Sequence, residues 1–173
     1  MHAPTPEDLD AVTAQLGRAA RGVRAIAHRC PCGLPDVVQT EPRLEDGTPF
    51  PTMYYLTCPR ACSEVGSLEG SGLMAAMTAR LATDAGLARA YLAAHEAYLA
   101  ERAELGDVPE IAGVSAGGMP DRVKCLHVLL AHSLAVGPGT NPLGDEIVGM
   151  MSPWWTSGRC VSSSAESDVG DRS

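Results

Sequence analysis

A chain of 173 residues corresponds to one globular domain with a short tail, at about 150 residues per domain. Its formal net charge of −8 at pH 7 argues against a general nucleic-acid binder, which needs a net positive surface. Aromatic residues make up only 4% of the chain, so Leu, Val, Ile, Met and Ala must build most of the core.

The first third of the chain predicts one helix followed by two short strands. Thr5 suits the N-cap and Pro6 the first position of the helix, and Gly17 ends it. Residues 37–38 and 53–56 are β-branched or aromatic and lie between Pro and Gly, as short strands do. The segment 23–27 is interpreted only as a lead into the next turn, and the proline-rich residues 41–51 as an extended loop.

Beyond Pro59 the pattern is helical. Apolar residues recur at roughly helical spacing, and a clear amphipathic helix follows Asp84. The next helix is predicted to open at residues 120–121 and to run through Leu134. It is apolar on nearly all sides, which is typical of a helix buried at the centre of its domain. Residues 142–151 form a short helix at best.

These elements predict an α+β fold, mainly α, with a central buried helix and a small two-stranded β element. We expect a single globular domain over residues 1–160 and a disordered acidic tail over residues 161–173, which are rich in Ser and Asp. Residues 1–8 lack the basic and apolar segments of a secretory signal, and the apolar stretch 125–136 is too short and too polar to span a bilayer. A cytoplasmic protein without membrane association is therefore expected.

Six cysteines are the unusual feature of the composition. In a reducing cytoplasm they are expected to be free thiols or metal ligands rather than disulfides. Cys30 and Cys32 lie in a Cys-Pro-Cys-Gly turn like half of a zinc knuckle, and Cys58 and Cys62 lie one helical turn apart at a helix start. These spacings are compatible with a tetrahedral zinc site, and inert buried thiols are the alternative.

A second cluster lies on the predicted central helix. Cys125 and His132 are seven residues apart and would share one face of that helix, although His132 could equally be a hydrogen-bonded core histidine. Arg122, Lys124 and His127 are candidate anion-binding residues, because free amides at a helix start favour negative charge. Cys125 is also a candidate nucleophile if a histidine from a neighbouring element lies within reach.

Several long strings of the sequence resemble one family. They are RCP (29–31), DGTPFPT (46–52), YYLT (54–57), AHE (94–96), GMPDRVKCLH (118–127) and AHSLA (131–135). Over about residues 6–150 the chain resembles an uncharacterised actinobacterial family, domain of unknown function number five hundred and one. The resemblance implies a cytosolic protein without an established activity, whose genes often lie near those for enolase, a septum-formation initiator and an exopolyphosphatase.

The resemblance also implies a set of metal ligands that would tie the N-terminal loops to the central helix: Cys30, Cys58, Cys125 and His132. Position 58 is Cys or His in relatives, an exchange between two types of zinc ligand. Cys160 or His127 is the substitute fourth ligand, whereas Cys32 and Cys62 match no motif residue of the family.

The leading hypothesis is a metal-stabilised binding or regulatory module that holds zinc, with an unknown protein partner or a small anionic ligand. An iron–sulfur redox sensor is the alternative from the same chemistry, and it would recruit Cys160 because such clusters prefer four thiolates. The alternative from a different class is a small hydrolase acting on a phosphorylated or anionic substrate, which uses Arg122, Lys124 and His127. If the thiols are inert, the protein holds no cofactor.

Overall fold

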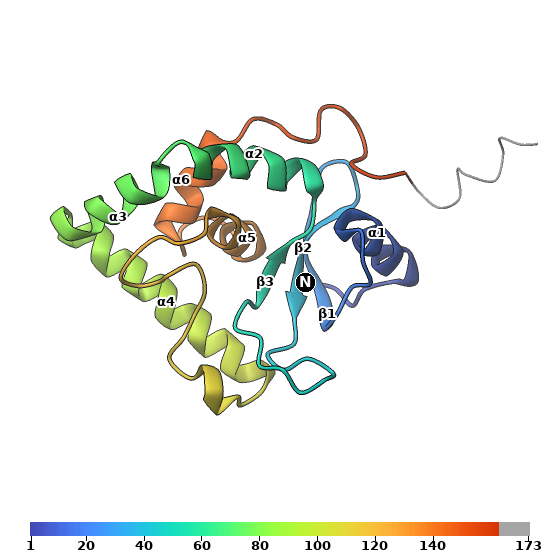
Figure 1. Cartoon of the computed structure of the whole chain (residues 1–173), viewed down its shortest axis with the longest axis horizontal. Helices are drawn as coiled ribbons and strands as arrows, with labels where there is room; N and C mark the ends of the chain where they lie inside the picture. Colours follow the sequence, from blue (N-terminus) through green and yellow to red (C-terminus); the bar gives the residue numbers. More distant parts are fainter. Residues whose placement is uncertain (163–173) are drawn as a thin grey trace, which may run out of the picture.

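The β-sheet has three antiparallel strands in the order β1 (Val23–Arg29), β2 (Pro35–Thr40) and β3 (Tyr54–Leu56). A computed structural model describes residues 1–162, and Figure 1 shows the sheet between helices α1 (Pro6–Leu16) and α5 (Leu126–Val136). The sequence predicts only two strands, and this number is wrong. Strand β1 escapes prediction because its pairing with β2 shifts register at three places, so its side chains do not alternate regularly between buried and exposed positions.

Helix α1 begins and ends where the sequence predicts. The Thr5 hydroxyl accepts a hydrogen bond from the Asp8 amide, and the Asp8 carboxylate accepts one from the Thr5 amide, so the two residues form a capping box. Gly17 ends the helix in the left-handed region, with φ of 66°. Both signals are local, which is why the sequence alone carries them.

The second half of the described chain is mainly helical, as predicted, so the whole is an α+β fold in which helices predominate. Around α5 the chain forms α2 (Pro59–Gly70), α3 (Leu73–Thr83), α4 (Ala85–Leu105), the short 3-10 helix η1 (Pro109–Ile111) and α6 (Pro142–Met150). Figure 1 shows α2 along one edge of the molecule, α3 and α4 along another, and α5 with α6 between them and the sheet.

Helix α5 begins later than the sequence predicts, at Leu126 instead of residues 120–121. The preceding residues form a closed loop, in which the Lys124 amide donates a 2.7 Å hydrogen bond to the Gly117 carbonyl. Gly117 and Gly118 both have positive φ, and a Cβ at Gly118 would lie 2.8 Å from the Arg122 carbonyl oxygen. The loop therefore requires glycine there, and it delays the helix to Leu126.

The two faces of the sheet are covered unequally. On the α5 side, Val37, Tyr54 and Leu56 join the large core that α2 to α6 complete. On the α1 side, a small cluster contains Val12 of the helix and Ile26 and Val38 of the strands. The sheet thus has one face packed against the large core, called the sealed face below although a pocket opens at its edge, and one face that a single short helix covers in part.

Two expectations concern the ends and the surroundings of the chain. Residues 163–173, which make up most of the predicted acidic tail, lie outside the described residues. Across residues 1–162, every helix is too short or too polar to cross a bilayer.

Candidate metal centre

The start of α5 is capped by a side chain from another helix. Cys125 occupies the N-cap position, but its own side chain makes no capping hydrogen bond. Instead Glu69, in the last turn of α2, accepts a 2.6 Å hydrogen bond from the Leu126 amide through Oε1. This carboxylate satisfies one of the free amides of α5 and places a negative charge at the positive end of its dipole.

The same carboxylate oxygen also lies 3.1 Å from Nδ1 of His127, in the first turn of α5. Glu69, Cys125 and His127 are all half-buried, and one donor atom of each lies within 4.8 Å of the others. Among residues 1–162 this is the one such group of three His, Cys, Asp or Glu side chains. A carboxylate oxygen of α2, the sulfur of the N-cap residue and an imidazole nitrogen of α5 thus lie close to one another.

Hydrogen bonding sets the charges in this cluster. The pKa of His127 is raised to about 9, first by its hydrogen bond with Cys125 and then, against the opposing effect of burial, by Glu69. Burial alone would raise the pKa of Glu69, but the hydrogen bonds from His127 and Leu126 outweigh burial and lower it. At neutral pH the pair without metal is therefore imidazolium and carboxylate.

A pocket of about 380 Å³ adjoins the cluster. Cys125 and His127 line it together with all of β3, which contributes Tyr54, Tyr55 and Leu56. Cys62 of α2 lines the same pocket, and burial, followed by its proximity to Cys125, raises the pKa of its thiol to about 11. The cluster is thus reached from a cavity that also holds a second, neutral thiol.

The structure disperses the ligand set that the family resemblance implies. Within residues 1–162, no three of Cys30, Cys58, Cys125 and His132 bring donor atoms within 4.8 Å of one another. Cys30 makes a hydrogen bond with Cys32 in the turn between β1 and β2, and burial raises its pKa to about 12. Cys58 is fully buried and makes a hydrogen bond with Cys160, and burial raises the pKa of Cys58 to about 12.

His132 belongs to the core. Its ring stacks on Tyr54 with centroids 5.8 Å apart and meets the edge of Tyr98 at 5.2 Å. The Asn141 side-chain amide lies 3.2 Å from Nδ1, and burial lowers the pKa of His132 to about 4. The histidine is therefore neutral and hydrogen-bonded, in keeping with the alternative interpretation of a core histidine. That interpretation expects a carbonyl group as the partner, whereas the partner here is the side-chain amide of Asn141.

The predicted anion-binding residues do lie near the start of α5, but in different settings. The Arg122 and Lys124 residues are exposed on the loop before the helix, whereas His127 is held by Glu69. Glu69 already supplies negative charge at the helix start, where the prediction places a bound anion. An anion at that position would have to displace this carboxylate.

Sequence reasoning misses Glu69, although one signal points to it. An acidic residue in the last turn of a helix is unfavourable, because the negative end of the dipole repels it. Glu69 lies at such a position in α2, and its favourable partner is the start of a helix 57 residues further along the chain. A misplaced charge of this kind suggests a long-range partner without identifying it.

Comparison with known proteins gives a family match. A family model described as a protein of unknown function, DUF501, matches residues 26–149, well over half of the chain. Searches of curated proteins and of solved structures found no significant match. All members of the cluster, Glu69, Cys125 and His127, lie inside the matched residues.

Proposed function

The chain belongs to the DUF501 family of proteins of unknown function, and from the cluster at the start of α5 we propose that it is a zinc-binding module. The zinc ligands are Glu69, Cys125 and His127. Bound zinc stabilises the junction of α2 and α5 and presents an open coordination position to a small anionic ligand.

The single observation that carries this proposal is the approach of three different donor atoms to within 4.8 Å of one another. Thiolate, imidazole and carboxylate are the three side-chain ligands of protein zinc sites. A thiolate and an imidazole together favour zinc over magnesium or calcium, which prefer oxygen ligands. Glu69 has two oxygens, so one can keep the Leu126 amide while the other binds metal.

Three protein ligands leave the fourth tetrahedral position for water or an exchangeable ligand. Cys125 and His127 line the 380 Å³ pocket, which supports access to that position. This feature also favours a second candidate function, a zinc-dependent hydrolase of a small phosphorylated or anionic substrate, in which the metal activates a bound water. Arg122 and Lys124 are exposed on the preceding loop and are the candidate substrate-binding side chains.

An iron–sulfur centre receives less support. Such clusters prefer four thiolates, whereas the cluster at α5 contains one cysteine, with Cys62 in the adjoining pocket. All six cysteines are free, which fits our further proposal that the protein works in the reducing cytoplasm.

Equilibrium dialysis against zinc, with elemental analysis, tests the proposal. The chain is first freed of metal by a chelator and its thiols are reduced. We expect one zinc per chain, loss of binding in Cys125→Ser and His127→Gln, and weaker binding in Glu69→Gln. Cys32→Ser is the matched control. This thiol lies in the turn between β1 and β2, so its replacement should leave zinc binding unchanged.

Cobalt substitution of the unaltered chain avoids any dependence on the folding of variants. A thiolate–cobalt charge-transfer band that disappears when zinc is added supports a cysteine-containing site. A chain that takes up no zinc, or a Cys125→Ser variant that binds zinc as well as the unaltered chain, contradicts the proposal. Zinc lost in Cys58→Ser but kept in Glu69→Gln would favour the ligand set implied by the family resemblance instead.

A further inference from the structure

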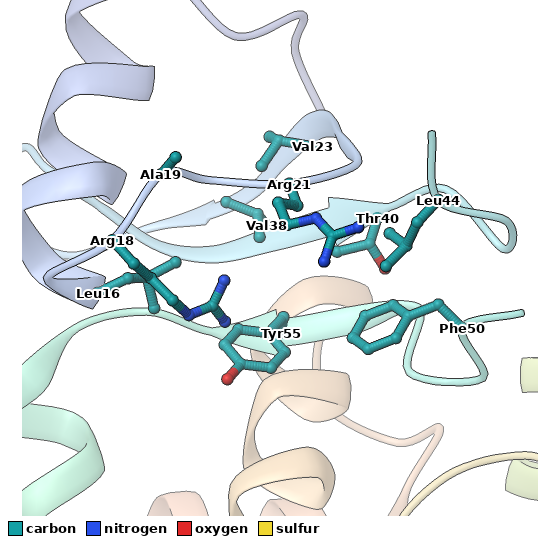
Figure 2. A pocket seen from close by; sticks show the side chains of 10 residues that line it. All are labelled: Leu16, Arg18, Ala19, Arg21, Val23, Val38, Thr40, Leu44, Phe50 and Tyr55. Carbon is teal, nitrogen blue, oxygen red and sulfur yellow. The ribbon is translucent and has the colours of Figure 1, made fainter. Parts of the chain in front are cut away.

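A second pocket, of about 510 Å³, lies on the α1 side of the sheet, on the other side of Tyr55 from the candidate metal centre. Its walls are the C-terminal end of α1, the connection to β1, and the loop between β2 and β3 (Figure 2). The volume falls in the range of small-molecule sites, about 300 to 1,000 Å³. It exists because α1 stops at Gly17 and leaves part of this face uncovered.

The floor of the pocket is apolar. Val23 and Val38 reach it from the sheet, and Phe50 and Tyr55 place their rings along one side, with centroids 6.4 Å apart. Figure 2 shows the two rings side by side along β3, below the two other strands. Such a surface favours the apolar part of a ligand, because binding removes both surfaces from water.

Two arginines supply the polar part of the pocket. Figure 2 shows the guanidinium groups of Arg18 and Arg21, from the connection that follows α1, between the two valines and the two rings. Arg21 is paired with Asp46 at 2.5 Å, whereas Arg18 makes no ion pair or hydrogen bond with any side chain in residues 1–162. Within residues 1–162, no acidic residue lines the pocket, although the chain carries a net charge of −8.

We propose that this pocket binds a small monocarboxylate with an apolar chain or ring. The carboxylate pairs with the guanidinium of Arg18, which presents two parallel N–H donors to such a group. The apolar part of the ligand lies on Val38, Phe50 and Tyr55. This site is separate from the zinc site, and its occupancy does not depend on metal.

The charge balance favours a carboxylate over a phosphate monoester. Asp46 neutralises Arg21, and Glu45 lies close by, where its carboxylate accepts a hydrogen bond from the Gly22 amide. Of the two arginines that line the pocket, Arg18 is therefore the one without a carboxylate partner among residues 1–162. Its charge matches a singly charged carboxylate, whereas a phosphate monoester carries about −1.5 to −2 at pH 7 and would be repelled by the two acids.

Titration of the full chain with octanoate, after a chelator has removed any metal, tests the proposal. NMR or calorimetry measures the binding. Octanoate should bind at least tenfold more tightly than octanamide, which has the same shape without the charge. Octyl phosphate should bind more weakly than octanoate. Affinity should rise about threefold for each methylene from butanoate to octanoate, because each one buries apolar area on the floor.

Two variants localise the binding. Arg18→Gln should weaken the binding of octanoate about tenfold. Arg24 is an exposed arginine on β1 outside the pocket, so Arg24→Gln should leave the affinity unchanged. Cys125→Ser should also bind octanoate normally, which separates this result from any failure of the zinc proposal. Equal affinity for octanoate and octanamide, tighter binding of octyl phosphate, or an unchanged affinity in Arg18→Gln each overturns the proposal.

Discussion

The two faces of the β-sheet differ, and adjacent residues show how. Tyr54 is fully buried on the α5 side, where its ring meets Tyr98 edge-on at 6.0 Å and its hydroxyl donates to Glu101. Tyr55, one position later, points to the α1 side, is half-buried and lines both cavities. The alternation of side chains along a strand thus directs Tyr54 into the large core and Tyr55 toward the pocket beside α1.

The sharpest test of the sealed face is at the contact of α5 with α6. A Cβ at Gly144 would lie 2.4 Å from the Leu129 carbonyl oxygen and 2.3 Å from the Ser133 hydroxyl. Gly144→Ala must therefore push the two helices apart and should lower the free energy of unfolding by about 3 kcal/mol in urea denaturation. Gly149→Ala, in the same helix with open space around it, should raise it by about 0.5–1 kcal/mol. Equal effects at both positions would show that α6 is not tightly packed.

Acidification should weaken the sealed face through His132. Its pKa is about 4 in the folded chain, below the ordinary value of 6.5, so the unfolded chain binds more protons between these values. Stability is therefore complete above pH 6.5 and falls as the pH drops toward 4, by on the order of 2 kcal/mol. Urea midpoints at pH 7 and pH 4.5 measure this loss. His132→Phe should remove it and exposed His2→Gln should not, whereas an unchanged slope in His132→Phe would place the effect elsewhere.

The difference between local and long-range signals explains how much of this arrangement the sequence predicts. The limits of α1 are encoded by Thr5, Pro6 and Gly17 themselves. Glu69 escapes prediction because its partners lie in another helix, and only folding brings them together.

The expected pairing of Cys125 with His132 rests on a continuous helix through both residues. In the structure Cys125 has extended backbone, with φ of −155°, and precedes α5. The helical spacing rule therefore does not apply to it, and its side chain meets Glu69 and His127 instead. The motif residues could be identified from the sequence, but the direction of each side chain depended on where the helix begins.

A matched pair of strand substitutions compares the two faces directly. Val37 and Val38 are neighbours in β2 and are both buried, Val37 toward α5 and Val38 toward α1. Val37→Ala should cost about 2 kcal/mol, because it leaves a cavity in a closed core. Val38→Ala should cost about 1 kcal/mol, because the space it leaves joins the 510 Å³ pocket. Urea denaturation of both variants measures the difference, and a larger cost at Val38 would contradict the asymmetry.

The smallest expected difference is in the free energy of unfolding, between substitutions of two arginines near α1. Arg29 makes two hydrogen bonds of 2.8 and 2.7 Å with the carboxylate of Asp8, and holds the pKa of that nearly buried carboxyl below its ordinary value. Arg29→Gln should therefore cost about 1 kcal/mol at pH 7, and this contribution should vanish as the pH falls through the pKa of Asp8. Arg18→Gln should change the free energy of unfolding by less than about 0.5 kcal/mol, because no side chain of residues 1–162 pairs with Arg18. A charge that contributes nothing to folding yet lies over an apolar floor is available to a ligand, so a clear loss of stability in Arg18→Gln would make it a structural residue.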